Sequence, residues 1–285
     1  MTLVVAYRSM GRIVVLSDTM ISHRDETLRN AIPGRLKSVV VNHWLTVAYS
    51  GLSTQALDAI RWVARESRLT TDEVVEHLVG ASKHYNPDLD FLVCSHEAPS
   101  KPRLLKVSNG HIHEGANFYW IGNAEAAQLL SALEMPTVHG ESGGEFFSLE
   151  ERQLSRRFHF LVDRGASPEI GGLVVEGLAS AHGHCYQDHS GSRIDKITIP
   201  DPLAPAIREA MNRGGMNGHY KYSVMSSHER GVAVVGTYFE QAQHGYIHAP
   251  LLHDDPERVY STDQTQFSNL LRLKSRECRA QNHVR

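Results

Sequence analysis

The chain opens with TLVVAYRSMGRIVVLSDTMIS (residues 2–22), and this stretch decides the class of fold. Residues 3–6 and 12–17 are two short runs rich in valine, and Gly11 lies in the polar segment between them. β-branched residues favour strands, and a glycine between two such runs is typical of a hairpin. The opening therefore predicts two antiparallel strands joined by a tight turn.

A second strand pair follows at residues 37–42 and 45–50, again with little alternation of apolar and polar residues. Such runs are expected in a sheet that is covered on both faces. Helices are then predicted from about Ser53 and from Thr70, where Glu73 completes a capping box. The order of strands and helices up to residue 200 favours an α+β fold in which helices cover the outer faces of two stacked sheets.

The sequence Pro200-Asp201-Pro202 predicts a boundary between two parts of the chain. Residues 1–200 would form the main domain, and residues 201–285 a C-terminal extension. The extension is predicted to hold a short helix at 205–212, a hairpin around 231–239 and a polar, basic tail from residue 271.

The composition excludes several classes of protein. A hydrophobic share of 41% and a net charge of −3 are typical of a globular protein with no surface for nucleic acid or an anionic membrane. No apolar stretch is long enough to cross a membrane, and the first residues do not resemble a secretory signal. The three cysteines are widely spaced, which predicts neither a disulfide framework nor a zinc site and favours the cytoplasm.

Three further residues stand at suggestive intervals after Thr2. Asp18 ends the second predicted strand, Lys37 begins the third, and Gly51 ends the fourth directly before a helix. In this order, TLVVAYRSMGRIVVLSDTMIS followed by RLKSVVVNHWLTVAYSGLSTQA resembles the opening of catalytic proteasome β subunits and their bacterial relatives. These belong to the threonine-dependent branch of the N-terminal nucleophile (Ntn) hydrolases. The resemblance is best over residues 1–65 and implies a four-layer αββα sandwich.

The resemblance implies that Thr2 is the nucleophile once Met1 has been removed. Removal of Met1 is expected because the side chain of Thr2 is small. A hydroxyl needs a nearby base, and a free α-amine, with a pKa of about 7.7–8.0, is suited to this role. The resemblance places Lys37 beside Thr2, where its ammonium would lower the pKa values of the Thr2 amine and hydroxyl, and it assigns to Asp18 the role of holding the lysine in place. It assigns the backbone N–H of Gly51 to the developing oxyanion. We therefore expect the Lys37 ammonium within reach of the Thr2 hydroxyl and the Asp18 carboxylate.

The resemblance also implies a substrate and an assembly. The substrate would be a peptide or protein, Ser22 would hold its backbone, and Tyr49 would form the base of the pocket next to the cleaved bond. For Tyr49, packing in the core beneath the helix near Thr54 is an equal alternative. We expect self-association, with rings implied by the resemblance, and no cofactor or metal; an ATP-dependent unfoldase partner is left open.

Two supporting elements of the family depart from its pattern. Asn123 stands where the family has a serine, Ser167 stands where it has an aspartate, and Ile170 stands where it has a second serine. An isoleucine side chain cannot hydrogen-bond. A non-catalytic structural or binding protein of the same fold is therefore the alternative to a threonine hydrolase.

A second alternative concerns a histidine-rich segment. His182, His184, Cys185 and His189 are ligand-type residues at close spacing, which a metal ion could use. The sequence favours a polar hairpin insert between two strands over a metal site.

Overall fold

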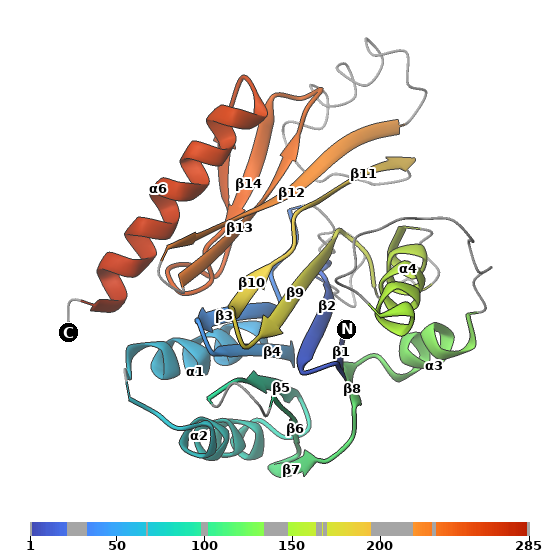
Figure 1. Ribbon diagram of the computed structural model, residues 1–285, viewed down its shortest axis with the longest axis vertical. Helices are drawn as coiled ribbons and strands as arrows, with labels where there is room; N and C mark the ends of the chain where they lie inside the picture. The colour runs from blue at the N-terminus through green and yellow to red at the C-terminus, as the bar shows by residue number, and fades with distance from the viewer. Residues whose placement is uncertain are drawn as a thin grey trace.

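The computed structural model describes residues 2–21, 33–66, 68–97, 102–133, 148–163, 167, 170–194, 219–229 and 232–283. Within these residues the chain forms three five-stranded antiparallel sheets and five helices (Figure 1). The helices are α1 (Ser53–Arg65), α2 (Thr71–His84), α3 (Ala124–Ala132), α4 (Leu149–Asp163) and α6 (Gln264–His283).

The first sheet has the strand order β10-β9-β2-β1-β8. Its strands are β1 (Leu3–Ser9), β2 (Arg12–Asp18), β8 (Phe118–Gly122), β9 (Val174–Ser180) and β10 (Gly183–Tyr186). The predicted N-terminal hairpin is confirmed, because β1 and β2 pair antiparallel with Val4 opposite Ser17 and Ser9 opposite Arg12. This register brings the start of β1 and the end of β2 to the same edge.

The second and third sheets keep their strands in chain order. The second sheet consists of β3 (Ser38–Asn42), β4 (Leu45–Gly51), β5 (Leu89–Ser95), β6 (Arg103–Ser108) and β7 (His111–Glu114). The third consists of β11 (His189–Ile194), β12 (His219–Glu229), β13 (Val232–Phe239), β14 (His244–His248) and β15 (Glu257–Tyr260). Most of these neighbours are joined by short connections, which favour antiparallel pairing, whereas α1 and α2 stand between β4 and β5.

Apolar side chains join the first and second sheets face to face. Val4 and Ile13 of the first sheet share one buried cluster with Leu92 and Leu104 of the second. Helices α1 and α2 pack against the second sheet, and α3 and α4 pack against the first. The β1–β2 hairpin is thus covered on both faces, as its unbroken apolar runs predicted.

The third sheet shares its buried apolar side chains with the rest of the chain. Helix α6 lies along it (Figure 1) and buries Phe267 and Leu271 in the cluster that also holds the apolar side of α1. Gly236 and Gly245 permit this approach, because a Cβ at either position would lie within 2.8 Å of the Phe267 ring. The third sheet is therefore an integral layer of the fold.

The expected four-layer αββα sandwich is wrong. The structure is mostly antiparallel β, with a third five-stranded sheet and a long helix that the expected architecture lacks. Local patterns after residue 200 predicted a short helix, a hairpin and a polar tail, whereas the tail forms part of α6, whose buried side chains recur at helical spacing. The physical reason is burial: β12–β14 carry apolar faces that need both α6 and the second sheet to cover them.

The predicted boundary near residue 200 lies in residues that the structure does not describe, as does the short helix expected at 205–212. Strand β11, which precedes that boundary, pairs with β12, which follows it. The division into residues 1–200 and 201–285 stays a prediction. Among the helices of the described residues, none is both long and apolar enough to pass through a bilayer.

Candidate functional site

Thr2, Asp18 and Lys37 meet at the open end of the β1–β2 hairpin. Thr2 directly precedes β1, Asp18 is the last residue of β2, and Lys37 directly precedes β3 of the second sheet. The hairpin register explains why Thr2 and Asp18 are neighbours although 16 residues separate them. Packing of the two sheets then brings Lys37 to the same point.

The Asp18 carboxylate is the centre of this group. Its Oδ1 accepts from the Thr2 hydroxyl at 2.6 Å, from the Lys37 ammonium at 2.8 Å and from the backbone N–H of Leu3 at 3.1 Å. Its Oδ2 accepts from the N–H of Gly171 at 3.2 Å. Asp18 is fully buried, so its charge is stabilised by these four donors in place of water.

Lys37 is also buried, with 6% of its surface exposed. Its ammonium donates a second hydrogen bond, to the carbonyl of Met20 at 2.6 Å. Burial lowers the pKa of Lys37 from its usual value, while the charge of Asp18 and its hydrogen bond act in the opposite direction. We expected the ammonium within direct reach of the Thr2 hydroxyl. In the structure the two groups instead donate to the same oxygen of Asp18.

Backbone contacts hold the segment that carries Asp18. The N–H of Met20 donates to the carbonyl of Gly171 at 3.1 Å, and the N–H of Leu173 donates to the Thr19 hydroxyl at 2.9 Å. Sequence reasoning missed the roles of Thr19, Met20 and Gly171. Such contacts leave little signal in sequence, because they use backbone atoms of residues about 150 positions apart.

Thr2 is held from the other side by the turn between β8 and α3. The Thr2 carbonyl accepts from the N–H of Asn123 at 2.6 Å. Gly122 has a φ of +99°, and a Cβ there would lie 1.9 Å from the Thr2 carbonyl oxygen. The Asn123 side chain caps α3 by accepting from the N–H of Ala126 at 2.7 Å. Asn123 thus supports Thr2 through its backbone.

Gly51 and Tyr49 lie at the end of β4, which pairs antiparallel with β3 and ends beside Lys37. The N–H of Tyr49 donates to the Lys37 carbonyl at 2.9 Å, and the Tyr49 hydroxyl donates to the carbonyl of Leu36 at 2.9 Å. Tyr49 belongs to the buried core beneath α1, and burial raises the pKa of its hydroxyl. Gly51 is exposed with a φ of +97°, and within the described residues no hydrogen bond joins it to the Thr2 group.

The remaining predicted site residues are Ser167 and Ser22, and Ile170 stands in place of the family's second serine. Ser167 is buried, and its carbonyl accepts from the N–H of Ile170 at 3.5 Å. Ile170 packs in the apolar cluster beneath α3 and α4. Ser22 lies outside the described residues.

The histidine-rich segment does not converge on one point. His184 faces the interior from β10, its neighbour Cys185 is half-buried, and His182 is exposed in the preceding turn. The His189 ring instead contacts the ring of His159, with centroids 5.1 Å apart. In the ranges that the structure covers, no group of three or more histidine, cysteine or acidic residues could hold a metal ion.

His184 takes part in a buried hydrogen-bonded chain that sequence reasoning missed. His96 Nε2 lies 3.0 Å from the carbonyl of Gly11, His96 Nδ1 lies 3.3 Å from His184 Nε2, and His184 Nδ1 lies 2.8 Å from the Thr46 hydroxyl. A carbonyl can only accept, so with His96 neutral each later donor is fixed: His184 Nε2–H to His96, and the Thr46 hydroxyl to His184. The chain links the turn of the β1–β2 hairpin to the second sheet.

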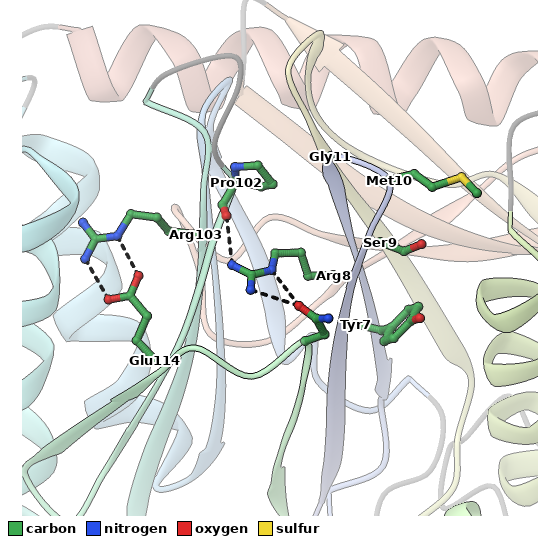
Figure 2. Close-up of a pocket in the computed structure, with 9 residues that line it drawn as sticks. Tyr7, Arg8, Ser9, Met10, Gly11, Pro102, Arg103 and Glu114 are labelled. Atoms are coloured by element: carbon green, nitrogen blue, oxygen red, sulfur yellow. Dashed lines mark hydrogen bonds and ion pairs between the residues drawn. The ribbon is translucent and has the colours of Figure 1, made fainter.

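A pocket of about 800 Å³ opens at this turn end of the hairpin, away from Thr2 (Figure 2). Arg8 crosses it and donates to the side-chain oxygen of Asn117 at 2.9 and 3.1 Å and to the carbonyl of Pro102 at 3.3 Å. Arg103 on its wall is paired with Glu114 at 3.0 Å. Its side chains join β1, β6, β7 and the residue before β8, and they include none of the predicted site residues.

No protein-family model matches this chain, and no curated protein matches it either. The geometry around Asp18 is therefore the basis for a functional proposal.

Proposed function

We propose that this chain is an N-terminal threonine hydrolase of peptide or amide bonds, similar in its site to the catalytic β subunits of proteasomes. One observation carries the proposal. The hydroxyl of Thr2 and the ammonium of Lys37 share one oxygen of Asp18, at 2.6 and 2.8 Å, in a buried setting. A hydroxyl, a lysine with a lowered pKa and a carboxylate are the groups that activation of a threonine requires.

The first step follows removal of Met1, which frees the α-amine of Thr2. The amine takes the hydroxyl proton as the threonine oxygen attacks the substrate carbonyl, and the π electrons move onto the carbonyl oxygen. Lys37 stabilises negative charge on the threonine oxygen, and Asp18 keeps the ammonium in place. The N–H of Gly51 donates to the oxyanion.

In the second half of the reaction the proton passes from the α-amine to the departing amine, and an ester with Thr2 remains. Water then attacks this ester with the α-amine again as the base, which releases the acid and restores the hydroxyl. All atoms come from the substrate, water and Thr2, so the scheme requires no cofactor.

The proposal extends to assembly, compartment and substrate contacts. We place the enzyme in a cytoplasmic homo-oligomer, with rings as one form, acting on peptides or proteins. Ser22 binds the substrate backbone, and Tyr49 limits the size of the side chain next to the cleaved bond. Unpaired Cys94, Cys185 and Cys278 accord with a reducing compartment.

A non-catalytic structural or binding role is the second candidate, and one observation favours it. Only 5% of the Thr2 surface is exposed, and Asp18 and Lys37 are 0% and 6% exposed. None of the three side chains therefore presents an open face to a substrate. In that case the three side chains serve as a buried polar link that fixes the hairpin to the second sheet.

Mass spectrometry separates the two candidates. The full chain is incubated with an epoxyketone peptide, which reacts with both the hydroxyl and the free α-amine of an N-terminal threonine. We expect loss of the Met1 mass and one adduct on the Thr2 peptide, whereas a Thr2→Ala variant should gain none. Retention of Met1, or an unmodified Thr2 peptide in protein that has lost Met1, would contradict the proposal.

A further inference from the structure

The loop between β14 and β15, residues 249–256, reaches from the third sheet to α1. Its carbonyl at Pro250 accepts from Arg61 Nε at 2.9 Å, and its Asp254 pairs with Arg61 Nη1 at 2.7 Å. The next residue, Asp255, forms an ion pair with Arg35. Three polar contacts thus fasten this loop to residues outside its own sheet.

Apolar contacts fix the same loop. Ala249 and Leu251 are 4% and 7% exposed and belong to the core cluster that contains Leu57 and Ile60 of α1. Burial of these side chains makes the position of Asp254 and Asp255 a defined feature of the fold.

Arg35 connects the loop to the candidate site. It lies two residues before Lys37, and its backbone N–H donates to the carbonyl of Thr19 at 2.6 Å, next to Asp18. Gly34 lies so close to Thr19 that a Cβ would be 2.2 Å from the same carbonyl oxygen. The Arg35 guanidinium also donates to the Ser53 hydroxyl at the start of α1. A movement of Arg35 would therefore displace the segment that carries Lys37.

The two arginines carry charges that carboxylates compensate: Arg35 pairs with Asp255, and Arg61 pairs with Asp254 at 2.7 Å and with Asp58 of its own helix at 3.4 Å. Their side chains are only 17% and 13% exposed, whereas Asp255 is 74% exposed. Arg35 Nε and Arg61 Nη2 are buried without a hydrogen-bond partner among the described residues. Loss of Asp255 would leave Arg35 as a buried cation without its ionic partner, and loss of Asp254 would leave Arg61 with only the longer contact to Asp58. Both changes favour movement of the arginine toward water.

We propose that Asp254 and Asp255 position Lys37 by holding Arg61 and Arg35, so that the C-terminal part of the chain controls the alignment of the Thr2 site. This inference rests on the proposed function, in which Lys37 is a catalytic group. Asp255 and Arg35 are positioning residues. Since burial and Asp18 account for the pKa of Lys37, Asp255 acts on Lys37 through the placement of the segment.

The test follows Lys37 directly, in full-length protein labelled with ¹³C-lysine, by NMR titration of its Cε resonance, which Lys37→Arg assigns. In Asp254→Asn/Asp255→Asn the segment loosens and water reaches the ammonium. We expect the Lys37 pKa to rise toward its usual value and hydrolysis of a peptide reporter to fall at least about tenfold in kcat. Asp255→Glu keeps the negative charge and should retain most of the wild-type Lys37 pKa and most of the wild-type kcat.

Glu257→Gln is the matched control, since Glu257 lies on the same stretch but pairs with Lys274 of α6 at 2.7 Å. It should leave the Lys37 titration unchanged. An unchanged Lys37 titration in the double asparagine variant, or an equal change in the control, would overturn the inference. If the double variant fails to fold, Asp255→Asn alone replaces it. The NMR titration needs no catalysis. An inactive wild type would therefore count against the proposed function, and the titration would still show whether Asp254 and Asp255 position Lys37.

Discussion

The two ends of the β1–β2 hairpin each carry a buried polar link between the first and second sheets, and these links are built differently. At the open end four donors surround the carboxylate of Asp18. At the turn end Thr46, His184, His96 and the carbonyl of Gly11 form a linear chain. The first link retains charge in the interior, whereas every group of the second is neutral.

This difference separates a group suited to chemistry from one suited to structure. A buried ammonium and a buried carboxylate shift the proton affinity of a hydroxyl beside them. The Thr2 hydroxyl donates a hydrogen bond to the carboxylate of Asp18. In the neutral chain each donor is already matched to an acceptor, and each proton has one position. We therefore expect changes at the open end to alter reactivity and changes at the turn end to alter stability alone.

Replacement of Thr2, the nucleophile of the proposed mechanism, is expected to have the largest effect. Thr2→Ala removes the attacking oxygen, so peptide hydrolysis should fall on the order of a thousandfold or more. Thr2→Ser keeps a hydroxyl and should retain measurable turnover. Both variants should keep the far-ultraviolet circular dichroism and oligomeric state of the wild type. Undiminished hydrolysis by the alanine variant would remove the distinction between the two ends.

Removal of the carboxylate tests how the charged link is held together. Asp18→Ala leaves the Lys37 ammonium buried without its ionic partner and should lower the free energy of unfolding by about 3–5 kcal/mol in urea titration. Adding Lys37→Met to this variant removes the unpaired charge and should recover part of the loss. Equal stability of the single and double variants would mean that Lys37 finds another environment.

The neutral link predicts a dependence of stability on pH. Burial, with repulsion from His96 and His43, lowers the pKa of His184 to about 3, and burial also lowers that of His96. Above pH 6.5 neither the folded nor the unfolded chain protonates these rings, so stability is full. Below it the unfolded chain binds protons first, and His184 should contribute a loss of stability that approaches about 1.4 kcal/mol per pH unit, with His96 adding a loss in the same direction.

Comparison with a variant isolates this contribution from that of other histidines, such as the buried His248, whose pKa burial lowers to about 4. His184→Gln cannot titrate, so its unfolding free energy should decline less steeply than that of the wild type between pH 6.5 and 4. A slope identical to the wild type would show that the chain is not neutral when folded.

The smallest effect is expected at the end of the neutral chain. Thr46→Val keeps the shape of the side chain but removes the donor to His184, which should cost about 1–2 kcal/mol of unfolding free energy. Thr46→Ser keeps the hydroxyl and should lie closer to the wild type. Peptide hydrolysis should be unaffected in both, and a loss of activity in Thr46→Val would contradict the separation of the two links.

The sequence by itself determined the local elements near the site. The valine-rich runs of the hairpin predicted β1 and β2, and the capping box of Thr70 and Glu73 is present at the start of α2. Because a tight turn joins two arms of equal length, the hairpin also placed Thr2 beside Asp18. These features depend on neighbours in the chain, so local patterns are sufficient to predict them.

The tertiary structure alone decided the contacts that complete the site and the fold. The N–H of Gly171 and the carbonyl of Met20 bind Asp18 and Lys37 through backbone atoms, which no residue type encodes. The pairing of His96 with His184 and the docking of α6 join segments far apart in the sequence. Their physical cause is the burial of whole faces of sheets, which depends on the packing of all layers together.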